Sequence, residues 1–429
     1  MLPEKAKETI KSGSADRFIK DLLGIRDENL EEYKERVVKA IDSFASLYGN
    51  ERDVAVFSVG GRSEISGNHT DHNGGKVIAA AVNLDIIAVA ATREDGVIRI
   101  KSEGLDEDVV GPEESKEPDP GKFSTSASLI AGTCHAFKAR GLNVGGFDAY
   151  TTSNVIKGSG LSSSAAFEVM IGKILSYFYN VNNVDTIEIA KSAQYAENVF
   201  FGKPCGLMDQ IACATGGLIT VDFSSPSNPA VRSIDFDFSS SGLSLCITNT
   251  GSSHVDLTDE YAAVPAEMKQ IASYFGKERL CEISSAEVED NINQLRKSFG
   301  DRAVMRALHF FCENERVEKQ KTALERNDKA AFLDLVKESG RSSFCYLQNV
   351  HSSSDAKNQG TSLALCVSDT FLKDKDGASR IQGGGFAGTI EAFVPNRYAN
   401  EYKDVIEKIF GVGSCQVLSI RQAGAVKII

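Results

Sequence analysis

A glycine- and serine-rich segment, IKGSGLSSSAA (residues 156–166), has the composition of an anion-binding loop. Gly158 and Gly160 allow the backbone to turn tightly and approach a ligand, because glycine has no Cβ. Serines 162–164 follow where a helix is expected to begin, so unpaired N–H groups and the positive end of the helix dipole would point into the loop. The segment predicts a phosphate site, with a serine-capped helix after a glycine turn as an equally good interpretation. No GxxxxGK[ST] pattern occurs in the chain, which excludes a Walker A loop.

Two carboxylates and an arginine could serve phosphoryl transfer to a hydroxyl, which needs positioning, charge neutralisation and often a carboxylate that receives the proton. Asp209, in GLMDQ, lies between a glycine turn and an apolar helical stretch. Local sequence alone favours a helix N-cap at this position. Glu197, on a predicted helix, could share a magnesium ion with a serine hydroxyl or be a surface glutamate. Arg62 is a fixed cation suited to phosphate oxygens or to orienting a carboxylate.

Polar side chains are densest in GGRSEISGNHTDHNGG (residues 60–75), which indicates either an exposed loop or a site. Its histidines, His69 and His72, are three residues apart and by themselves are more typical of loop or core positions than of ligands. A second glycine-rich segment, GGGFAG (383–388), formally matches GxGxxG. The TIEAFVP that follows predicts a strand, whereas a dinucleotide loop needs a helix. We therefore expect this segment to approach a ligand or the first glycine loop through its backbone.

The elements that must position these residues are helices and strands in mixed order, which predicts an α+β fold with mixed sheets. Apolar periodicity and glycine stops predict helices at 28–48, 128–141, 167–179 and 187–202, and mostly helical structure over 257–338. Strands are expected at 53–59, 76–94, 97–104, 147–155, 217–225 and 243–250. The dipeptide Asp95–Gly96 favours a tight hairpin, so we expect 76–94 and 97–104 to be adjacent antiparallel strands.

Composition sets limits on the class of protein. A chain of 429 residues favours two domains, and the serine- and proline-rich segment 224–233 is the best boundary, giving domains 1–225 and 226–429. A net charge of −12 disfavours binding to nucleic acid or an anionic membrane. The chain has no run of about 18 apolar residues, and its N-terminus reads as an amphipathic helix rather than a secretion signal. Nine cysteines without CxxC pairs suggest reduced thiols, so we expect a cytoplasmic protein.

Taken together, the motifs resemble the GHMP small-molecule kinase superfamily and, within it, the galactokinase family. The resemblance covers about residues 44–429 and rests on four motifs in the family's order, with a tail, RQAGA (421–425), that is also similar. These motifs are GRSEISGNHTDHNGG (61–75), IKGSGLSSSAA (156–166), AENVFFGKPCGLMDQ (196–210) and RIQGGGFAG (380–388).

The resemblance implies a two-lobed GHMP kinase fold, with an N-terminal ribosomal S5-like α/β domain, a C-terminal ferredoxin-like domain and the active site between them. It implies ATP and Mg²⁺, and phosphorylation of galactose at its anomeric hydroxyl by a monomer or weak homodimer. Asp209 would be the catalytic base and Arg62 the cation that poises it, while Ser164 and Glu197 would bind magnesium. The implied nucleotide-binding residues are Gly158, Ser159, Gly160, Leu161, Ser162, Ser163, Ser164, Gly384 and Gly385. The implied substrate-binding residues are Asn68, His69, Asp71, His72, Gly206 and Tyr261.

Two departures from the family pattern fall where the sugar is expected to be read. Asn68 stands where the galactokinase motif has glutamate, and His72 where it has tyrosine. A carboxylate only accepts hydrogen bonds, whereas asparagine both donates and accepts, so the identity of the sugar stays open. The alternatives are a kinase for a related sugar (an N-acetylated, acidic or pentose analogue) and, from a different class, a non-catalytic sugar sensor on the same fold.

Overall fold

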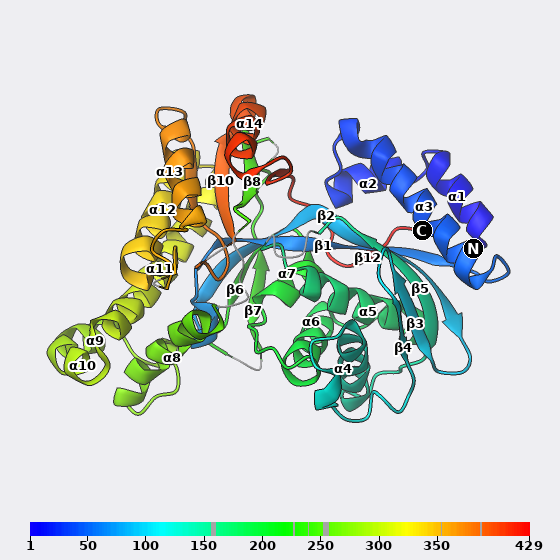
Figure 1. Cartoon of the computed structure of the whole chain (residues 1–429), viewed down its shortest axis with the longest axis horizontal. Helices are drawn as coiled ribbons and strands as arrows, with labels where there is room; N and C mark the ends of the chain where they lie inside the picture. Colours follow the sequence, from blue (N-terminus) through cyan, green and yellow to red (C-terminus); the bar gives the residue numbers. More distant parts are fainter. Residues whose placement is uncertain (156–159, 226–227, 239, 252–256, 353, 387) are drawn as a thin grey trace.

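The computed structural model describes the whole chain except residues 156–159, 226–227, 239, 252–256, 353 and 387. Its strands form two sheets (Figure 1), one with the order β12-β1-β2-β5-β3-β4 and β6–β7 attached to β2, the other with the order β11-β8-β10-β9. The strands are β1 (Ala55–Ser66), β2 (Lys76–Arg93), β3 (Ile98–Ser102), β4 (Glu107–Val110), β5 (Gly146–Ser153), β6 (Leu218–Asp222), β7 (Ala230–Ser233), β8 (Leu243–Asn249), β9 (Ala378–Ile381), β10 (Thr389–Pro395), β11 (Cys415–Leu418) and β12 (Val426–Lys427).

Helices cover both sheets, and the predicted α+β class with mixed sheets is confirmed. The predicted amphipathic N-terminal helix is two shorter helices, α1 and α2. The helices are α1 (Pro3–Lys11), α2 (Asp16–Leu23), α3 (Leu30–Tyr48), α4 (Ser126–Ala139), α5 (Ser163–Tyr179), α6 (Thr186–Tyr195), α7 (Met208–Thr215), α8 (Thr258–Tyr274), α9 (Ser285–Asp290), α10 (Ile292–Phe299), α11 (Asp301–Glu325), α12 (Lys329–Ser342), α13 (Gly360–Leu372) and α14 (Ala399–Phe410).

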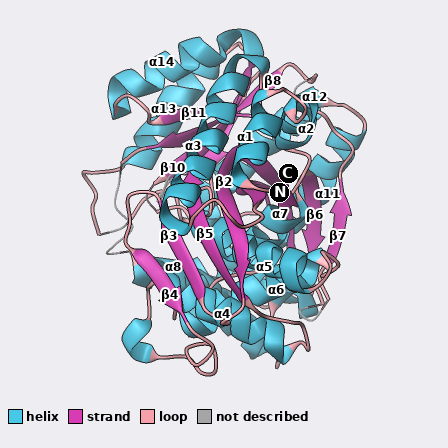
Figure 2. Ribbon diagram, turned by 90° about the vertical axis from the view of Figure 1, so that its right-hand side faces the viewer, coloured by secondary structure: helices cyan, strands magenta, loops and turns pink. Residues whose placement is uncertain are grey.

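The first sheet is buried on both faces, because consecutive residues of its central strands β1 and β2 are buried along most of their length. Successive side chains of a strand point to opposite faces. Phe57 of β1 belongs to the core shared with α4–α7, whereas its neighbour Val56 belongs to the core shared with α1–α3. Figures 1 and 2 show these two helical layers on either side of the sheet. The N-terminal helices, most of whose residues precede the family resemblance, therefore complete the core behind the strand that carries Arg62.

The predicted hairpin between residues 76–94 and 97–104 is wrong. In the structure β5 lies between β2 and β3, antiparallel to the first (Arg93↔Gly146) and parallel to the second (Ile98↔Phe147). The turn at Asp95–Gly96 exists, and the Asp95 carboxylate accepts a hydrogen bond from Val97 N. However, β5 is buried along nearly its whole length and gains a ladder of hydrogen bonds on both edges, which favours its insertion.

The first strand is longer than the predicted 53–59 and runs through half of the polar segment 60–75. β1 continues to Ser66, paired with β2, with register shifts between Gly60 and Arg62 and between Glu64 and Ser66. Such bulges bend a strand and re-aim its side chains. The polar residues of GGRSEIS are therefore buried on a rigid strand, and only the second half of the segment forms a turn.

The second sheet is antiparallel throughout, and α13 and α14 pack against one of its faces. The hairpin β6–β7 crosses residue 225, with Val221 opposite Val231, so pairing in the first sheet continues to Ser233. The last strand also returns to the first sheet, where β12 pairs with β1. The division at 225/226 stays a prediction, and the strand pairing shows that both ends of the chain contribute to the sheet bearing Arg62.

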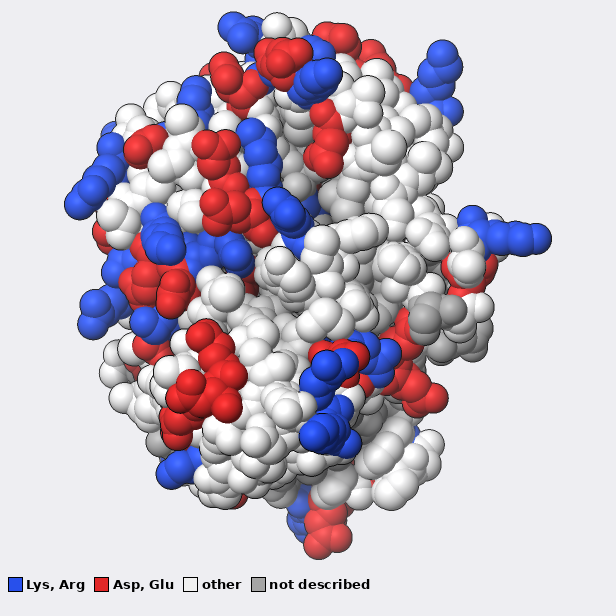
Figure 3. All heavy atoms as spheres, turned by 90° about the vertical axis from the view of Figure 1, so that its left-hand side faces the viewer, with Lys and Arg blue, Asp and Glu red and all other residues white. Residues whose placement is uncertain are grey.

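Charged side chains of both signs are interspersed on the face that carries α11–α13 (Figure 3). No helix in the described part of the chain is long and apolar enough to cross a membrane.

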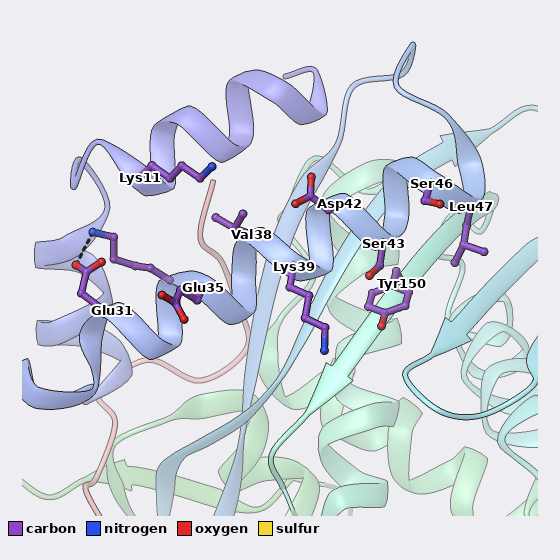
Figure 4. Close-up of a pocket in the computed structure, with 11 residues that line it drawn as sticks. Lys11, Glu31, Glu35, Val38, Lys39, Asp42, Ser43, Ser46, Leu47 and Tyr150 are labelled. Atoms are coloured by element: carbon purple, nitrogen blue, oxygen red, sulfur yellow. Dashed lines mark hydrogen bonds and ion pairs between the residues drawn. The ribbon is translucent and has the colours of Figure 1, made fainter.

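A cavity of about 650 Å³ lies between α1, α3 and β5 (Figure 4), where Lys11, Val38 and Tyr150 line its wall. None of the predicted site residues borders this cavity.

Candidate active site

Arg62 and Asp209 form a planar, two-pronged ion pair. Arg62 Nε donates to Asp209 Oδ1 and Arg62 Nη2 donates to Asp209 Oδ2, both at 2.7 Å. Asp209 is the second residue of α7, whose N-cap is Leu207, and it makes no capping bond. The N-cap interpretation of Asp209 is therefore wrong. The bulge in β1 and the first turn of α7 instead bring the two charged groups face to face.

The same pair is joined to the first glycine loop. The Ser162 hydroxyl donates to Asp209 Oδ2, and Arg62 Nη1 donates to the carbonyl of Gly160. Arg62 also donates its backbone N–H to Leu161 O at 3.1 Å. These contacts hold the carboxylate directly beside the start of α5.

The electrostatics of the pair keep Asp209 ionised. Burial raises the pKa of Asp209, but the charge and hydrogen bonds of Arg62 outweigh burial and hold that pKa below its usual value. The pKa of Arg62 is correspondingly raised, because the attraction of Asp209 exceeds the effect of burial. Asp209 is thus a hydrogen-bond acceptor at neutral pH, oriented by a permanently charged partner.

The first glycine loop contacts the second sheet. Gly160 has a φ of +70°, and a Cβ there would lie 2.3 Å from Thr389 Oγ1 of β10, so the close approach requires glycine. Gln382 Nε2 donates to Gly160 O at 3.2 Å. Ser162 is the N-cap of α5 and Ser163 its first residue, which confirms a helix start at these serines. Gly158 and Ser159 lie outside the described residues.

Ser164 and Glu197 lie close enough to share a cation. Ser164 Oγ donates to Glu197 Oε1 at 3.1 Å, and Gln210 Nε2 donates to Glu197 Oε2 at 2.9 Å. A hydroxyl and a carboxylate are the oxygen ligands that Mg²⁺ prefers, and such sites commonly use one or two protein ligands plus phosphate oxygens and water. No group of three or more His, Cys, Asp or Glu suited to a metal occurs in the described part of the chain. The donor set therefore fits a magnesium ion completed by a phosphate ligand.

Glu168 and Gln210 are site residues that the sequence reasoning missed. Glu168 of α5 is buried, and Gln210 Nε2 lies between its Oε2 (3.4 Å) and Glu197. Burial first, and then the charge of Glu197, raise the pKa of Glu168 well above its usual value. The available signal was a glutamate inside the apolar run FEVMIGKIL, directly after the serines.

The second glycine loop binds residues predicted to contact the sugar. Three successive carbonyl oxygens of residues 383–385, between β9 and β10, accept hydrogen bonds from three of these side chains. In order, Asn68 Nδ2 donates to Gly383 O at 2.6 Å, His69 Nε2 to Gly384 O at 2.8 Å, and Tyr261 Oη to Gly385 O at 2.6 Å. The loop thus holds the turn after β1 through its backbone, and nucleotide binding by Gly384 and Gly385 stays a prediction.

Asn68 is fully occupied by protein partners. Its Nδ2 also donates to Glu64 Oε1 at 3.0 Å. Its Oδ1 accepts from Ser343 Oγ at 3.2 Å and from Asn349 Nδ2 at 2.8 Å. An asparagine amide offers two donors and an acceptor with two lone pairs, so no hydrogen-bonding position is left for a sugar hydroxyl. This geometry disfavours the predicted substrate contact of Asn68.

His69, by contrast, presents a free acceptor. Because a carbonyl only accepts hydrogen bonds, the His69 Nε2 that faces Gly384 O carries the proton, which leaves Nδ1 as an acceptor. Burial and the neighbouring His72 lower the pKa of His69 to about 4, so the ring is neutral at physiological pH. Its Nδ1 is buried and has no partner among the residues that the structure describes. A ligand hydroxyl would satisfy it.

Asp71 joins the sugar motif to the turn before Asp209. A Cβ on Gly206 would lie 2.1 Å from Asp71 Oδ2, so only glycine allows this carboxylate to lie against the turn. His72 Nε2 is 3.5 Å from Asp71 Oδ1 on the more exposed side. The predicted sugar residues Asp71, His72 and Gly206 are therefore brought together. Gly206 is three residues before the predicted base, Asp209.

Two family models match the chain: the GHMP kinases N terminal domain over residues 125–217 and the galactokinase galactose-binding signature over residues 42–92. A galactokinase from Actinobacillus pleuropneumoniae serotype 3 is 30% identical over 383 residues, which cover 86% of this chain and 92% of that protein. The chain belongs to the galactokinase family. A galactokinase from Streptomyces coelicolor is 29% identical over 389 residues, covering 89% of this chain and 95% of that protein.

Solved structures of the superfamily share the fold. The crystal structure of Lactococcus lactis galactokinase complexed with galactose matches with a TM-score of 0.77 at 24% identity, covering 90% of this chain and 98% of that one. A mevalonate kinase structure matches with a TM-score of 0.59 at 16% identity, covering 85% and 99% of the two chains. The expectation of a two-lobed GHMP kinase fold is confirmed.

Proposed function

We propose that this member of the galactokinase family transfers the terminal phosphoryl group of ATP to the anomeric hydroxyl of galactose. One observation carries the proposal: an ionised Asp209, fixed by Arg62, lies between the predicted phosphate loop and the predicted sugar turn. Ser162 contacts Asp209 from the side of the predicted phosphate loop, and the Gly206–Asp71 contact lies on the side of the predicted sugar turn. An attacking hydroxyl and a phosphoryl group would meet at this junction, so a base here could receive the hydroxyl proton.

The chemical step assigned to this chain is simple. The sugar oxygen forms a bond to the terminal phosphorus while the bond from that phosphorus to the bridging oxygen of ADP breaks, and the hydroxyl proton passes to Asp209. Arg62 keeps its charge throughout and holds the carboxylate in line. Because the pKa of Asp209 is lowered, it is a weak base, and its contribution is mainly to orient the hydroxyl and take the proton late, as a loose transition state allows.

Ser164 and Glu197 would hold magnesium in this proposal. When bound, the ion would neutralise charge on the phosphate oxygens. Gln210 fixes the second carboxylate oxygen of Glu197 and so leaves Oε1 facing Ser164. Burial and the charge of Glu197 raise the pKa of Glu168, which disfavours a further negative charge behind Glu197. The chain's own contribution is therefore a pre-oriented pair of oxygen ligands.

His69 and Asp71 would be the main residues that bind the sugar hydroxyls. His69 Nδ1 is a buried acceptor without a partner in the described structure, and Asp71 offers a carboxylate beside Gly206. Both groups accept hydrogen bonds, which suits a ligand covered with hydroxyl donors. Tyr261 and Asn68 instead hold the glycine loop, by donating hydrogen bonds to Gly385 O and Gly383 O. The relatives are galactokinases, which favours galactose as the sugar. His72 departs from the family motif and lies on the more exposed side of the turn.

An ADP-release assay across a sugar panel tests the proposal. The panel contains galactose, N-acetylgalactosamine, galacturonic acid and arabinose, each with ATP and Mg²⁺. We expect the highest kcat/KM with galactose and a product phosphate on the anomeric oxygen, which ³¹P and ¹H NMR would show. Turnover with another sugar and none with galactose would contradict the assignment of galactose, and no turnover with any sugar would favour a sensor.

A further inference from the structure

Lys203 lies in the turn between the π-helical segment Ala196–Phe200 and α7, and no role has yet been assigned to it. Its Nζ is 3.1 Å from Glu197 Oε1, the same oxygen that accepts from Ser164 Oγ at 3.1 Å. The Lys203 side chain is 63% exposed, whereas that of Glu197 is 3% exposed. A long side chain thus reaches from the surface and places an ammonium group at the oxygen assigned to magnesium.

The surrounding charges explain why a cation is held there. Arg62 is committed to Asp209 through both of its prongs, so it is not available to pair with the nearby Glu197. Among the ion pairs of the described residues, Lys203 is the basic partner of Glu197. Burial lowers the pKa of Lys203, but the charges of Glu197 and Asp209 outweigh burial and raise that pKa, so the ammonium is charged.

We propose that Lys203 is a phosphate-binding residue that occupies the cation position at Glu197 until nucleotide and metal arrive, and then pairs with a phosphate oxygen. This inference rests on the function proposed above. An ammonium group and a divalent ion repel each other, so both cannot contact Glu197 Oε1 at once. Binding of a divalent ion there therefore displaces the ammonium. The exposed stem leaves Lys203 free to turn, and the incoming phosphate group supplies a new anionic partner.

The exchange keeps a buried carboxylate paired at every stage. An unpaired buried charge is strongly destabilising, whereas a buried charge with a partner does not carry the whole of that cost. Lys203 compensates Glu197 in the free protein, and the metal would compensate it in the complex. The same lysine would then offset part of the charge that the nucleotide brings into a protein of net charge −12.

Binding measurements without sugar and without turnover test this inference. Lys203→Met is compared with the wild type, with Lys203→Arg and with Lys191→Met. Lys191 of α6 pairs with Glu188 at 2.9 Å and is the matched control, because it is also a lysine in an ion pair but lies outside the site. Mn²⁺ binding to the nucleotide-free protein is followed by electron paramagnetic resonance, and ADP binding in EDTA by calorimetry.

We expect Lys203→Met to bind Mn²⁺ several-fold more tightly, because the competing ammonium is gone. We expect it to bind metal-free ADP about tenfold more weakly, because a charge-assisted hydrogen bond is lost. Lys203→Arg should restore most of the ADP affinity, and Lys191→Met should match the wild type in both measurements.

Three results would overturn the inference. Unchanged Mn²⁺ affinity in Lys203→Met would show that the ammonium does not compete for the Glu197 site. Tighter Mn²⁺ binding with unchanged ADP affinity would reduce Lys203 to a counter-ion of Glu197 without a phosphate role. Equal effects in Lys191→Met would reduce the result to general loss of positive charge. Failure of the wild type to phosphorylate galactose would instead contradict the proposed function, and these binding results would stand apart from it.

Discussion

At the scale of single residues, the site is organised around which hydrogen-bonding positions are already filled. Asp209 has its carboxylate committed to Arg62 and Ser162, and Asn68 has all four positions committed to protein groups. His69 Nδ1 remains unpaired in the described structure. In the proposed function, filled groups would supply orientation and open groups would recognise the ligand. Within the turn after β1, these two roles would fall to Asn68 and His69 respectively.

Asp209→Asn should lose most turnover while retaining sugar binding. The amide can still contact Arg62 and Ser162, but it has no basic oxygen to receive the hydroxyl proton. Loss of a positioned base typically costs about 10²–10⁴-fold in kcat. Steady-state kinetics and sugar calorimetry on the same preparation check this prediction, and a variant with near wild-type kcat would rule out Asp209 as the base.

Arg62→Met should move the acid limb of the kcat/KM profile to higher pH. The pKa of Asp209 is raised by burial and lowered more strongly by Arg62, so removal of the arginine leaves burial to dominate. Asp209 would then hold its proton at pH values where the wild-type carboxylate is ionised. Activity measured from pH 4 to pH 8 tests the direction, with Arg62→Lys as a control that retains the charge and should shift less.

At the scale of elements, the second glycine loop connects the two sheets. It follows β9, and its carbonyl oxygens receive Asn68 and His69 from the turn after β1. Near the same place Arg380 of β9 donates to the Glu64 carboxylate of β1 at 2.8 Å and to Glu391 of β10 at 2.6 Å. A buried ion network and a set of backbone acceptors therefore fix the sugar turn against the second sheet.

Asn68→Asp tests whether this residue positions the loop or reads the sugar. An aspartate cannot donate to Glu64 or Gly383 O, and it places a second carboxylate beside Glu64. We expect a fall of about 1–3 kcal/mol in the free energy of unfolding and a lower kcat, with the ratio of kcat/KM between galactose and the other sugars unchanged. Asn183→Asp, on the surface, is the control. A changed sugar preference would assign Asn68 to the sugar instead.

Much of the site could be predicted from motifs, whereas the contacts could not. The motifs identified Arg62, Asp209, Ser164 and Glu197. The structure pairs Arg62 with Asp209 and Ser164 with Glu197. The saturation of Asn68 depends on Ser343 and Asn349, which lie far along the chain and outside every motif. The strand order failed for the same reason, because the partner of β2 is chosen by the long-range insertion of β5.

At the scale of the whole molecule, the first sheet is closed by the end of the chain. Arg421 Nη1 donates to Ser58 Oγ at 2.9 Å, and β12 pairs with β1 through Phe57↔Lys427. Beyond this strand Ile428 N donates to Val56 O at 2.7 Å. The strand that bears Arg62 therefore depends for one of its edges on residues beyond 420.

Ile428→Pro should destabilise the protein more than Ile428→Ala. Both variants lose the isoleucine side chain, but proline also removes the N–H that pairs with the buried Val56 carbonyl. An unsatisfied buried carbonyl costs about 1–3 kcal/mol, so we expect a difference of that size between the two free energies of unfolding in urea. Equal values would show that the tail contributes packing without pairing to β1.

The return of β12 to β1 also orders events during synthesis. Translation proceeds from the N-terminus at about 5–20 residues per second. Residue 426 is the 364th residue added after residue 62, and its synthesis comes on the order of 20–70 s later. Throughout that interval the edge of β1 has no strand to cover it, and an uncovered edge pairs readily with other chains. The nascent polypeptide therefore has a long interval in which the edge of β1 can pair with another chain before β12 covers it.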